Sequence, residues 1–294
     1  QEKTDLKLNI IGKIPEILLD NTDKNRTSPF AFTGNKFEFR GVGALANCAI
    51  PMTVLITIVA KQLKEFKIEV DALVNEKKLK KDEAVFNVLR EYIKDSKAIR
   101  FEGDGYGEAW EKEAKKRGLS NNKSTPEALK VKISDKAINL FEEMQVMSKM
   151  ELEARYDVGL ESYSKKTQIE CRVLGDIARN HVVPTAVIYQ NTLLENTKNL
   201  KEIFGEDYKN IAKEQIDLIM IISNHITQIN ALVIEMEVEK TKANKFEGLK
   251  SAVYYSKKVK PFFEEIRYHC DQLETMVDDN LRPLTKYREL LFTK

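Results

Sequence analysis

The sequence has few of the residues that interrupt helices. Only 12 glycines and 7 prolines occur in 294 residues, whereas 32% of the residues are charged. Collagen-like chains need a glycine at every third position, and disordered chains have few apolar residues, so the 42% hydrophobic content excludes both classes. Long stretches without glycine or proline therefore favour a folded, mainly helical protein.

An excess of charge of one sign is also missing. The chain has 48 Lys and Arg residues against 46 Asp and Glu residues, a formal net charge of +2. A balance this even creates no field that would hold a polyanion, so we expect neither nucleic acid nor a membrane surface as a partner. The longest apolar run, residues 49–60, is well short of the roughly 20 residues that cross a bilayer, so we expect no transmembrane span.

Cysteine is scarce as well. Cys48, Cys171 and Cys270 lie far apart, without the spacing of a metal site or a disulfide framework. We therefore expect reduced thiols and a cytoplasmic protein. The first residues, QEKTDLKLN, have no signal-peptide pattern and begin with Gln, so we expect the chain to be a part of a longer polypeptide.

The N-terminal region contains the clearest strand signal. Residues 27–43 contain four phenylalanines in alternation around the turn sequence Thr33-Gly34-Asn35, which predicts two short strands joined tightly. Alternating side chains of a strand point to opposite sides, so Phe37 and Phe39 should share one side. The other side should then carry Lys36, Glu38 and Arg40.

Beyond Gly43 the apolar residues recur at intervals of three and four, which predicts helices. We expect them at about 49–75 and 82–94, in a short segment ending at Gly118, at about 126–157 and 162–203 with a kink at Pro184, and over the stripes 219–236 and 252–276. The turn sequence GLSNNKSTP at 118–126 predicts a domain boundary near residue 120. The fold class expected is mainly α (α+β), with an N-terminal β-hairpin and helices in residues 1–118 and an antiparallel long-helix bundle in residues 124–294.

The helical part offers little chemistry. His181, His225 and His269 fall on or beside apolar stripes, where histidines packed in a bundle core are more common than metal ligands. The glycine loop at 103–107 resembles a phosphate cradle. It lacks the wider GxGxxG spacing and a preceding buried strand, so a simple turn is favoured.

The hairpin is the stronger candidate for a catalytic site. Arg26, Lys36, Glu38 and Arg40 lie within fifteen residues, and a carboxylate between guanidinium groups can hold a divalent metal while the arginines neutralise a transferring phosphoryl group. The alternative is a strand with alternating charges that faces solvent, and spacing alone favours that alternative.

Several longer motifs bear on this choice. They are NRTSPF at 25–30, NKFEFR at 35–40, Ala46-Asn47, FEGDGYGEAW at 101–110, GLSNNKSTPEAL at 118–129, RNHVVPTA at 179–186 and RPLTKYRELLF at 282–292. The set resembles the C-terminal portion of glutamine synthetases, specifically the long bacterial type III form. The resemblance covers essentially the whole chain.

The resemblance implies roles for four residues. Glu38 corresponds to a ligand of Mg²⁺ or Mn²⁺, and Arg40 to a residue that contacts glutamate and the reacting phosphoryl group. Arg26 corresponds to a residue that contacts ATP and glutamate, and Lys36 lies at a basic position associated with the nucleotide. Ala31 stands where common forms of the family have a second arginine.

The resemblance also implies an activity. The parent would be an ATP-dependent glutamate–ammonia ligase that forms glutamine through γ-glutamyl phosphate, with glutamate, ammonia and ATP as partners, and it would be a homo-oligomer of stacked rings. Residues 1–118 would close its catalytic domain, and residues 124–294 would form a helical extension. The chain alone should be inactive, because the family's other metal ligands lie upstream. The alternatives are a non-enzymatic helical oligomerisation module and a ligase of the same superfold that acts on another amine.

Overall fold

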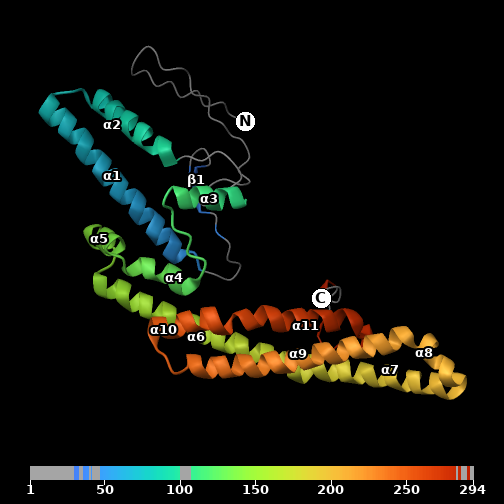
Figure 1. Cartoon of the computed structure of the whole chain (residues 1–294). Helices are drawn as coiled ribbons and strands as arrows, with labels where there is room; N and C mark the ends of the chain where they lie inside the picture. The colour runs from blue at the N-terminus through green and yellow to red at the C-terminus, as the bar shows by residue number, and fades with distance from the viewer. Residues whose placement is uncertain are drawn as a thin grey trace, which may run out of the picture. The chain divides into compact units, whose positions relative to one another are not determined.

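The computed structural model describes residues 30–32, 36–39, 41, 47–99, 107–282, 284–285 and 290–291. The chain divides into two compact units, residues 1–121 with 135–149 and residues 122–134 with 150–294 (Figure 1). The assignment of residues 1–118 to a catalytic domain and 124–294 to an extension stays a prediction.

The first unit is built on a pair of helices, α1 (Ala49–Lys77) and α2 (Lys81–Asp95). Asn47, two residues before α1, accepts a hydrogen bond from the backbone N–H of Ala49, the first residue of the helix, at 2.8 Å. Lys78 ends it in the left-handed conformation, with φ at 57°, which lets the chain turn back. The buried residues between the two helices are Val70, Ala84 and Val88. The helices predicted at 49–75 and 82–94 are confirmed.

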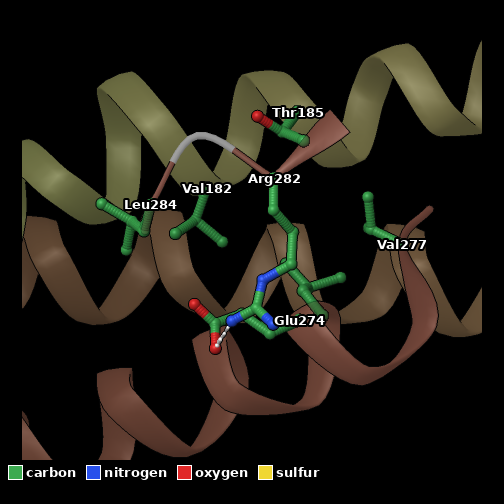
Figure 2. Close-up of a pocket in the computed structure, with 7 residues that line it drawn as sticks. Val182, Thr185, Glu274, Val277, Arg282 and Leu284 are labelled. Atoms are coloured by element: carbon green, nitrogen blue, oxygen red, sulfur yellow. Dashed lines mark ion pairs between the residues drawn. The ribbon is translucent and has the colours of Figure 1, made fainter. Parts of the chain in front are cut away.

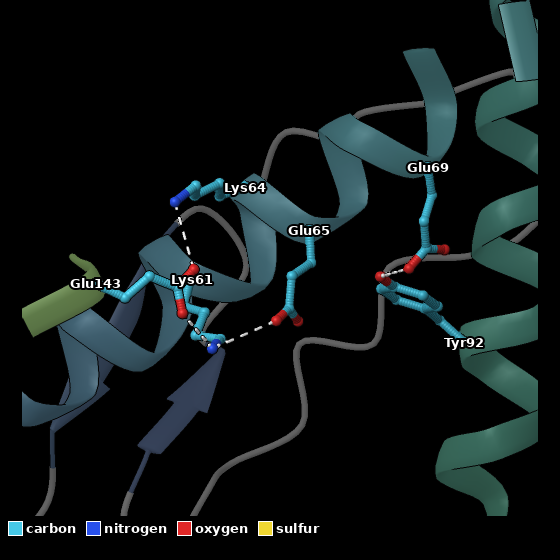
Figure 3. Close-up of polar contacts among 6 residues, drawn as sticks. All are labelled: Lys61, Lys64, Glu65, Glu69, Tyr92 and Glu143. Atoms are coloured by element: carbon cyan, nitrogen blue, oxygen red, sulfur yellow. Dashed lines mark hydrogen bonds and ion pairs between the residues drawn. The ribbon is translucent and has the colours of Figure 1, made fainter. Parts of the chain in front are cut away.

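Polar contacts connect α1 to α2 and to α5 (Asp135–Glu143), as Figure 3 shows. Both Lys61 and Lys64 bind the carboxylate of Glu143, with nitrogen–oxygen distances of 2.7 and 3.3 Å. Tyr92 on α2 donates a hydrogen bond to Glu69 on α1 at 2.9 Å. The hydrogen bond from Lys61, together with that from Lys64, lowers the pKa of Glu143 below its usual value. The remaining helical segments of this unit are η1 (Ser96–Ile99) and α3 (Glu108–Lys116).

The second unit is a bundle of long helices, as predicted. Its long members are α6 (Lys149–Ile177), α7 (Val183–Phe204), α9 (Lys213–Ala243) and α11 (Pro261–Met276). The shorter segments are α4 (Thr125–Leu129), η2 (Lys130–Ile133), η4 (Gly205–Asp207), α8 (Tyr208–Ile211), α10 (Gly248–Tyr254) and η6 (Asp279–Leu281). Helix α9 packs against both α7 and α11, and its core face consists of Ile222, His225, Ile229, Val233 and Met236.

The bundle contains two π-helical turns, and each lies just before a proline. The turn η3 (Ala178–Val182) joins α6 to α7 and ends two residues before Pro184, and η5 (Tyr255–Val259) ends two residues before Pro261. Proline has no N–H to donate to the carbonyl four residues earlier, so the hydrogen-bond ladder is interrupted there. The backbone N–H of Lys260 instead binds the carbonyl of Tyr255, at 2.9 Å. The irregularity predicted at Pro184 is therefore present, as a wider turn beside the proline.

The helix predicted over 126–157 is wrong. Residues 125–143 form three short segments, and α6 begins only at Lys149. Gln145 has a φ of 55°, a left-handed conformation that ends a helix. The next helix starts where the backbone N–H of Lys149 donates to the carboxylate of Glu142 at 3.0 Å. No glycine or proline marks this break.

The interruption predicted between 157 and 162 is also wrong, because α6 runs through it. This stretch contains Gly159. A Cβ atom at Gly159 would lie 3.1 and 3.3 Å from the two terminal methyls of Leu129, which is tighter than ordinary contact. The glycine therefore allows α4 to approach α6 and does not end the helix.

Helix α9 is long and apolar enough to cross a membrane by length and composition alone. Its stripe from Ile222 to Met236 is buried against neighbouring helices of the same unit. Packing in the bundle therefore accounts for this stripe, whereas other apolar side chains of α9, such as Met220 and Ile234, stay exposed.

Candidate functional site

The N-terminal hairpin is present as predicted. Strands β1 (Phe30–Phe32) and β2 (Phe37–Phe39) pair antiparallel, with Phe30 opposite Phe39, Ala31 opposite Glu38 and Phe32 opposite Phe37. The turn predicted at 33–35 lies outside the described residues. The register places the Cα of Glu38, the predicted metal ligand, directly across from Ala31.

The charged side of β2 contains an ion pair. Lys36 Nζ lies 3.5 Å from Glu38 Oε1, and the side chains are 66% and 37% exposed. Two residues apart on a strand, these side chains project to the same side, as the alternation predicted. Arg26 and Arg40, the predicted arginines, lie outside the described residues, so their roles stay predictions.

This hairpin does not form a metal site by itself. In the described parts of the chain, no group of three or more His, Cys, Asp or Glu side chains is placed to hold a metal ion. Glu38 supplies one carboxylate, and the ammonium group of Lys36 already offsets part of its charge. A hard cation such as Mg²⁺ needs about six oxygen ligands, so one carboxylate would leave it almost fully hydrated. Further ligands would have to come from outside the described residues.

Of the predicted glycine loop at 103–107, the structure describes only Gly107. Residues 103–106 lie outside the described residues. Gly107 precedes α3 in extended backbone, with φ at −81° and ψ at 157°, which is an ordinary helix start.

A small pocket lies between the start of α7 and the C-terminal end of α11 (Figure 2). Its lining is mostly apolar and consists of Val182, Thr185, Leu273, Glu274, Val277, Arg282 and Leu284. Arg282 binds Glu274 with a nitrogen–oxygen distance of 2.5 Å, while its Nε is buried without a hydrogen-bond partner. Because Glu274 offsets the guanidinium charge, this contact ties Arg282 to α11 and does not form an anion site. Arg282 begins the RPLTKYRELLF motif.

Two of the three histidines meet in the bundle. Nδ1 of His225 on α9 lies 2.8 Å from Nδ1 of His269 on α11, and the ring centroids are 5.1 Å apart. Burial, and to a smaller extent the nearby His269, lower the pKa of His225. His181 is exposed on η3. The sequence placed each histidine on an apolar stripe, but that pattern does not show which stripes face each other.

The comparisons with known proteins find similarity to glutamine synthetases. Residues 84–201 match a family model described as the glutamine synthetase C-terminal domain, and this range includes parts of both units. The chain is 50% identical over its whole length to a glutamine synthetase of Bacteroides fragilis and covers 40% of that protein. It is 34% identical to the type-3 glutamine synthetase of Dictyostelium discoideum, over 99% of this chain and 39% of the relative.

A glutamine synthetase of Butyrivibrio fibrisolvens is 31% identical over 93% of this chain, which corresponds to 38% of the relative. The chain therefore spans about two fifths of the length of these relatives.

Proposed function

Since the chain belongs to the glutamine synthetase family, we propose that it works as part of an ATP-dependent glutamate–ammonia ligase of the type III form. In this proposal, residues 1–118 close the catalytic domain and present the hairpin to the active site. Residues 124–294 are a helical extension. The observation that carries the proposal is the hairpin, which puts Glu38 and Lys36 side by side within the motif NKFEFR.

The reaction proceeds in two steps. The side-chain carboxylate of glutamate attacks the terminal phosphorus of ATP, which forms γ-glutamyl phosphate and releases ADP. Ammonia then attacks the acyl carbon and displaces phosphate. Negative charge builds up on the transferring phosphoryl oxygens, and positive side chains fixed around them lower the barrier.

This chain supplies four residues to that chemistry in our proposal. Arg26 contacts ATP and glutamate, Arg40 contacts glutamate and the phosphoryl group, and Lys36 contacts the nucleotide. Glu38 supplies one oxygen ligand to Mg²⁺ or Mn²⁺, whose charge helps to neutralise the phosphates when the ion is bound. The ammonium group of Lys36, 3.5 Å from Glu38, orients the carboxylate before the cation arrives.

The test uses the polypeptide extended to the full length of its relatives. We expect Glu38→Gln to raise the Mg²⁺ concentration that gives half-maximal activity, since the substitution removes a charged ligand but keeps the shape. Arg40→Gln should lower kcat by about 10²–10³-fold, as expected for a lost contact to the developing charge. The matched control is Glu264→Gln, at an exposed carboxylate on α11 in the other unit.

One outcome would refute the catalytic role of Glu38 and Arg40. If Glu38→Gln and Arg40→Gln both match the Glu264→Gln control in metal dependence and kcat, the charged side of β2 is a solvent-facing surface. Turnover that is faster with another amine than with ammonia would instead support a related ligase of the same superfold.

We also propose that the protein is a homo-oligomer in the cytoplasm. Support for oligomerisation comes from apolar side chains of α9 that its own unit leaves uncovered: Met220, Ile234 and Val238 are 60%, 54% and 47% exposed. Support for the location comes from the three free cysteines. A purely structural oligomerisation module would use the same α9 surface. It would assemble normally and show no dependence of activity on Glu38 or Arg40.

A further inference from the structure

The contact between His225 and His269 is unusual in its chemistry. Each ring comes from a different long helix, and both rings approach through the same atom type, Nδ1, at 2.8 Å. His225 is only 9% exposed, and buried Ile222 and Ile229 flank it on α9. Buried Ile266 and Leu273 flank His269 on α11. The backbone on both sides of the contact is therefore held by packing, so the two helices keep the rings close together while each ring can turn about its own side-chain bonds.

Without a ligand, this contact is a hydrogen bond between two neutral rings. One Nδ1 carries a proton and donates it, and the other Nδ1 accepts it. If both rings were protonated, two N–H groups would face each other. The arrangement therefore keeps at least one imidazole nitrogen as a lone-pair donor, which is the form that binds transition metals.

The distance between the nitrogens also matches one coordination geometry. Two imidazole nitrogens about 2.0 Å from a metal are about 2.8 Å apart when the angle at the metal is a right angle, as in square-planar or tetragonal complexes. They are about 3.3 Å apart in a tetrahedral complex. The observed 2.8 Å separation fits the right-angled geometry without a shift of either helix. Each ring has to turn by about 45°, so that its Nδ1 lone pair points at the metal and no longer along the line between the two nitrogens.

We propose that His225 and His269 form a two-histidine chelate for a late first-row divalent cation of the Ni²⁺ or Cu²⁺ class, which would cross-link α9 and α11. The site is independent of the proposed ligase activity. No third His, Cys, Asp or Glu side chain completes it in the part of the chain that the structure describes, so water fills the other coordination positions.

The protons balance at neutral pH. In the free pair, one ring carries its proton on Nδ1 and the other on Nε2. When the metal binds both Nδ1 atoms, the first ring moves its proton to Nε2, and no net proton is released. Tyr268, next to His269, is 57% exposed, and its ring centroid lies 5.2 Å from that of His269. The pair therefore lies beside an exposed side chain, close to solvent.

The test uses Ni²⁺ and the full chain. The chain contains only three histidines, so its imidazole C–H signals in a ¹H–¹³C NMR spectrum can be assigned with His181→Gln, an exposed site that should fold normally. We expect substoichiometric Ni²⁺, which is paramagnetic, to broaden the signals of His225 and His269 before that of His181. Calorimetry should show one saturable site, weakened roughly tenfold or more by His225→Ala or His269→Ala because each removes one of the two protein ligands.

Wild-type NMR keeps the proposal falsifiable even if an alanine variant does not fold. Equal broadening of all three histidines, or broadening of His181 alone, would overturn it. The absence of saturable binding, or the same affinity in folded His225→Ala, would also overturn it. Bound Ni²⁺ should raise the unfolding temperature of the wild type and of His181→Gln, because the ion binds the folded state only.

Discussion

The two glycines of α6 allow a matched test of how the bundle packs. Gly159 and Gly175 both lie inside this helix, so replacing either with alanine improves helix propensity by about 1 kcal/mol. Their surroundings differ. A Cβ at Gly175 would lie 3.4 Å from a methyl of Val233 and 3.7 Å from Met236, which are ordinary contact distances, whereas a Cβ at Gly159 would lie 3.1 Å from Leu129.

Because of these distances, we expect the same glycine-to-alanine change to affect the free energy of unfolding differently at the two positions. Gly175→Ala should raise the free energy of unfolding by about 1 kcal/mol, because helix propensity improves and the new methyl fills an apolar contact. In Gly159→Ala, the same gain is offset by overpacking against Leu129, which typically costs about 1–3 kcal/mol. We therefore expect no gain or a loss.

A double-mutant cycle tests the cause. In a Leu129→Ala background the crowding is removed, so Gly159→Ala should recover its gain of about 1 kcal/mol. Urea unfolding followed by circular dichroism measures the four proteins of the cycle, and two further proteins, Gly175→Ala in each background, serve as controls. If Gly159→Ala has the same effect with and without Leu129, the close contact between α4 and α6 is absent and our explanation of the glycine is wrong.

Three further predictions follow from the contacts. The lowered pKa of Glu143 means that its ion pairs stabilise the fold above its unperturbed pKa of 4.5 and lose this effect as the pH falls below 4.5; the urea midpoint of Glu143→Gln should therefore fall less with acidification than that of the wild type. Tyr255→Phe should cost about 0.5–1.5 kcal/mol in urea unfolding, because it removes a partly buried hydrogen bond to Asn244 Oδ1, 2.5 Å long; an unchanged midpoint would contradict it. The chain alone should have no γ-glutamyl transferase activity with ADP and Mg²⁺ or Mn²⁺; turnover within about tenfold of a full-length type III enzyme would refute this, because one carboxylate does not fix a hydrated ion.

The elements with the strongest local patterns could be predicted from the sequence. The apolar stripes of α1 and α9 recur at three and four residues, and this period reflects the helix itself, whatever packs on it. The alternation of Phe37, Glu38 and Phe39 likewise predicted a strand and placed Lys36 beside Glu38. The candidate residues of the hairpin came from motifs that are also local, and their meaning came from the resemblance to a family.

Contacts within the folded chain decided the features that the local patterns missed. The chain breaks at Gln145, where no glycine or proline stands, and short-range contacts hold the left-handed turn there, among them that of the Lys149 N–H with Glu142. It continues as a helix through Gly159, because Leu129 from a distant segment needs the space.

The histidine pair shows most directly that local sequence patterns do not reveal which helices face each other. His225 and His269 are 44 residues apart, and each looks like an ordinary core position in its own stripe. Helical periodicity tells which face of a helix is buried, since that depends on neighbours three and four residues away. Which stripe meets which, and at what register, depends on how whole helices pack, and that information lies in the fit between surfaces far apart in the sequence.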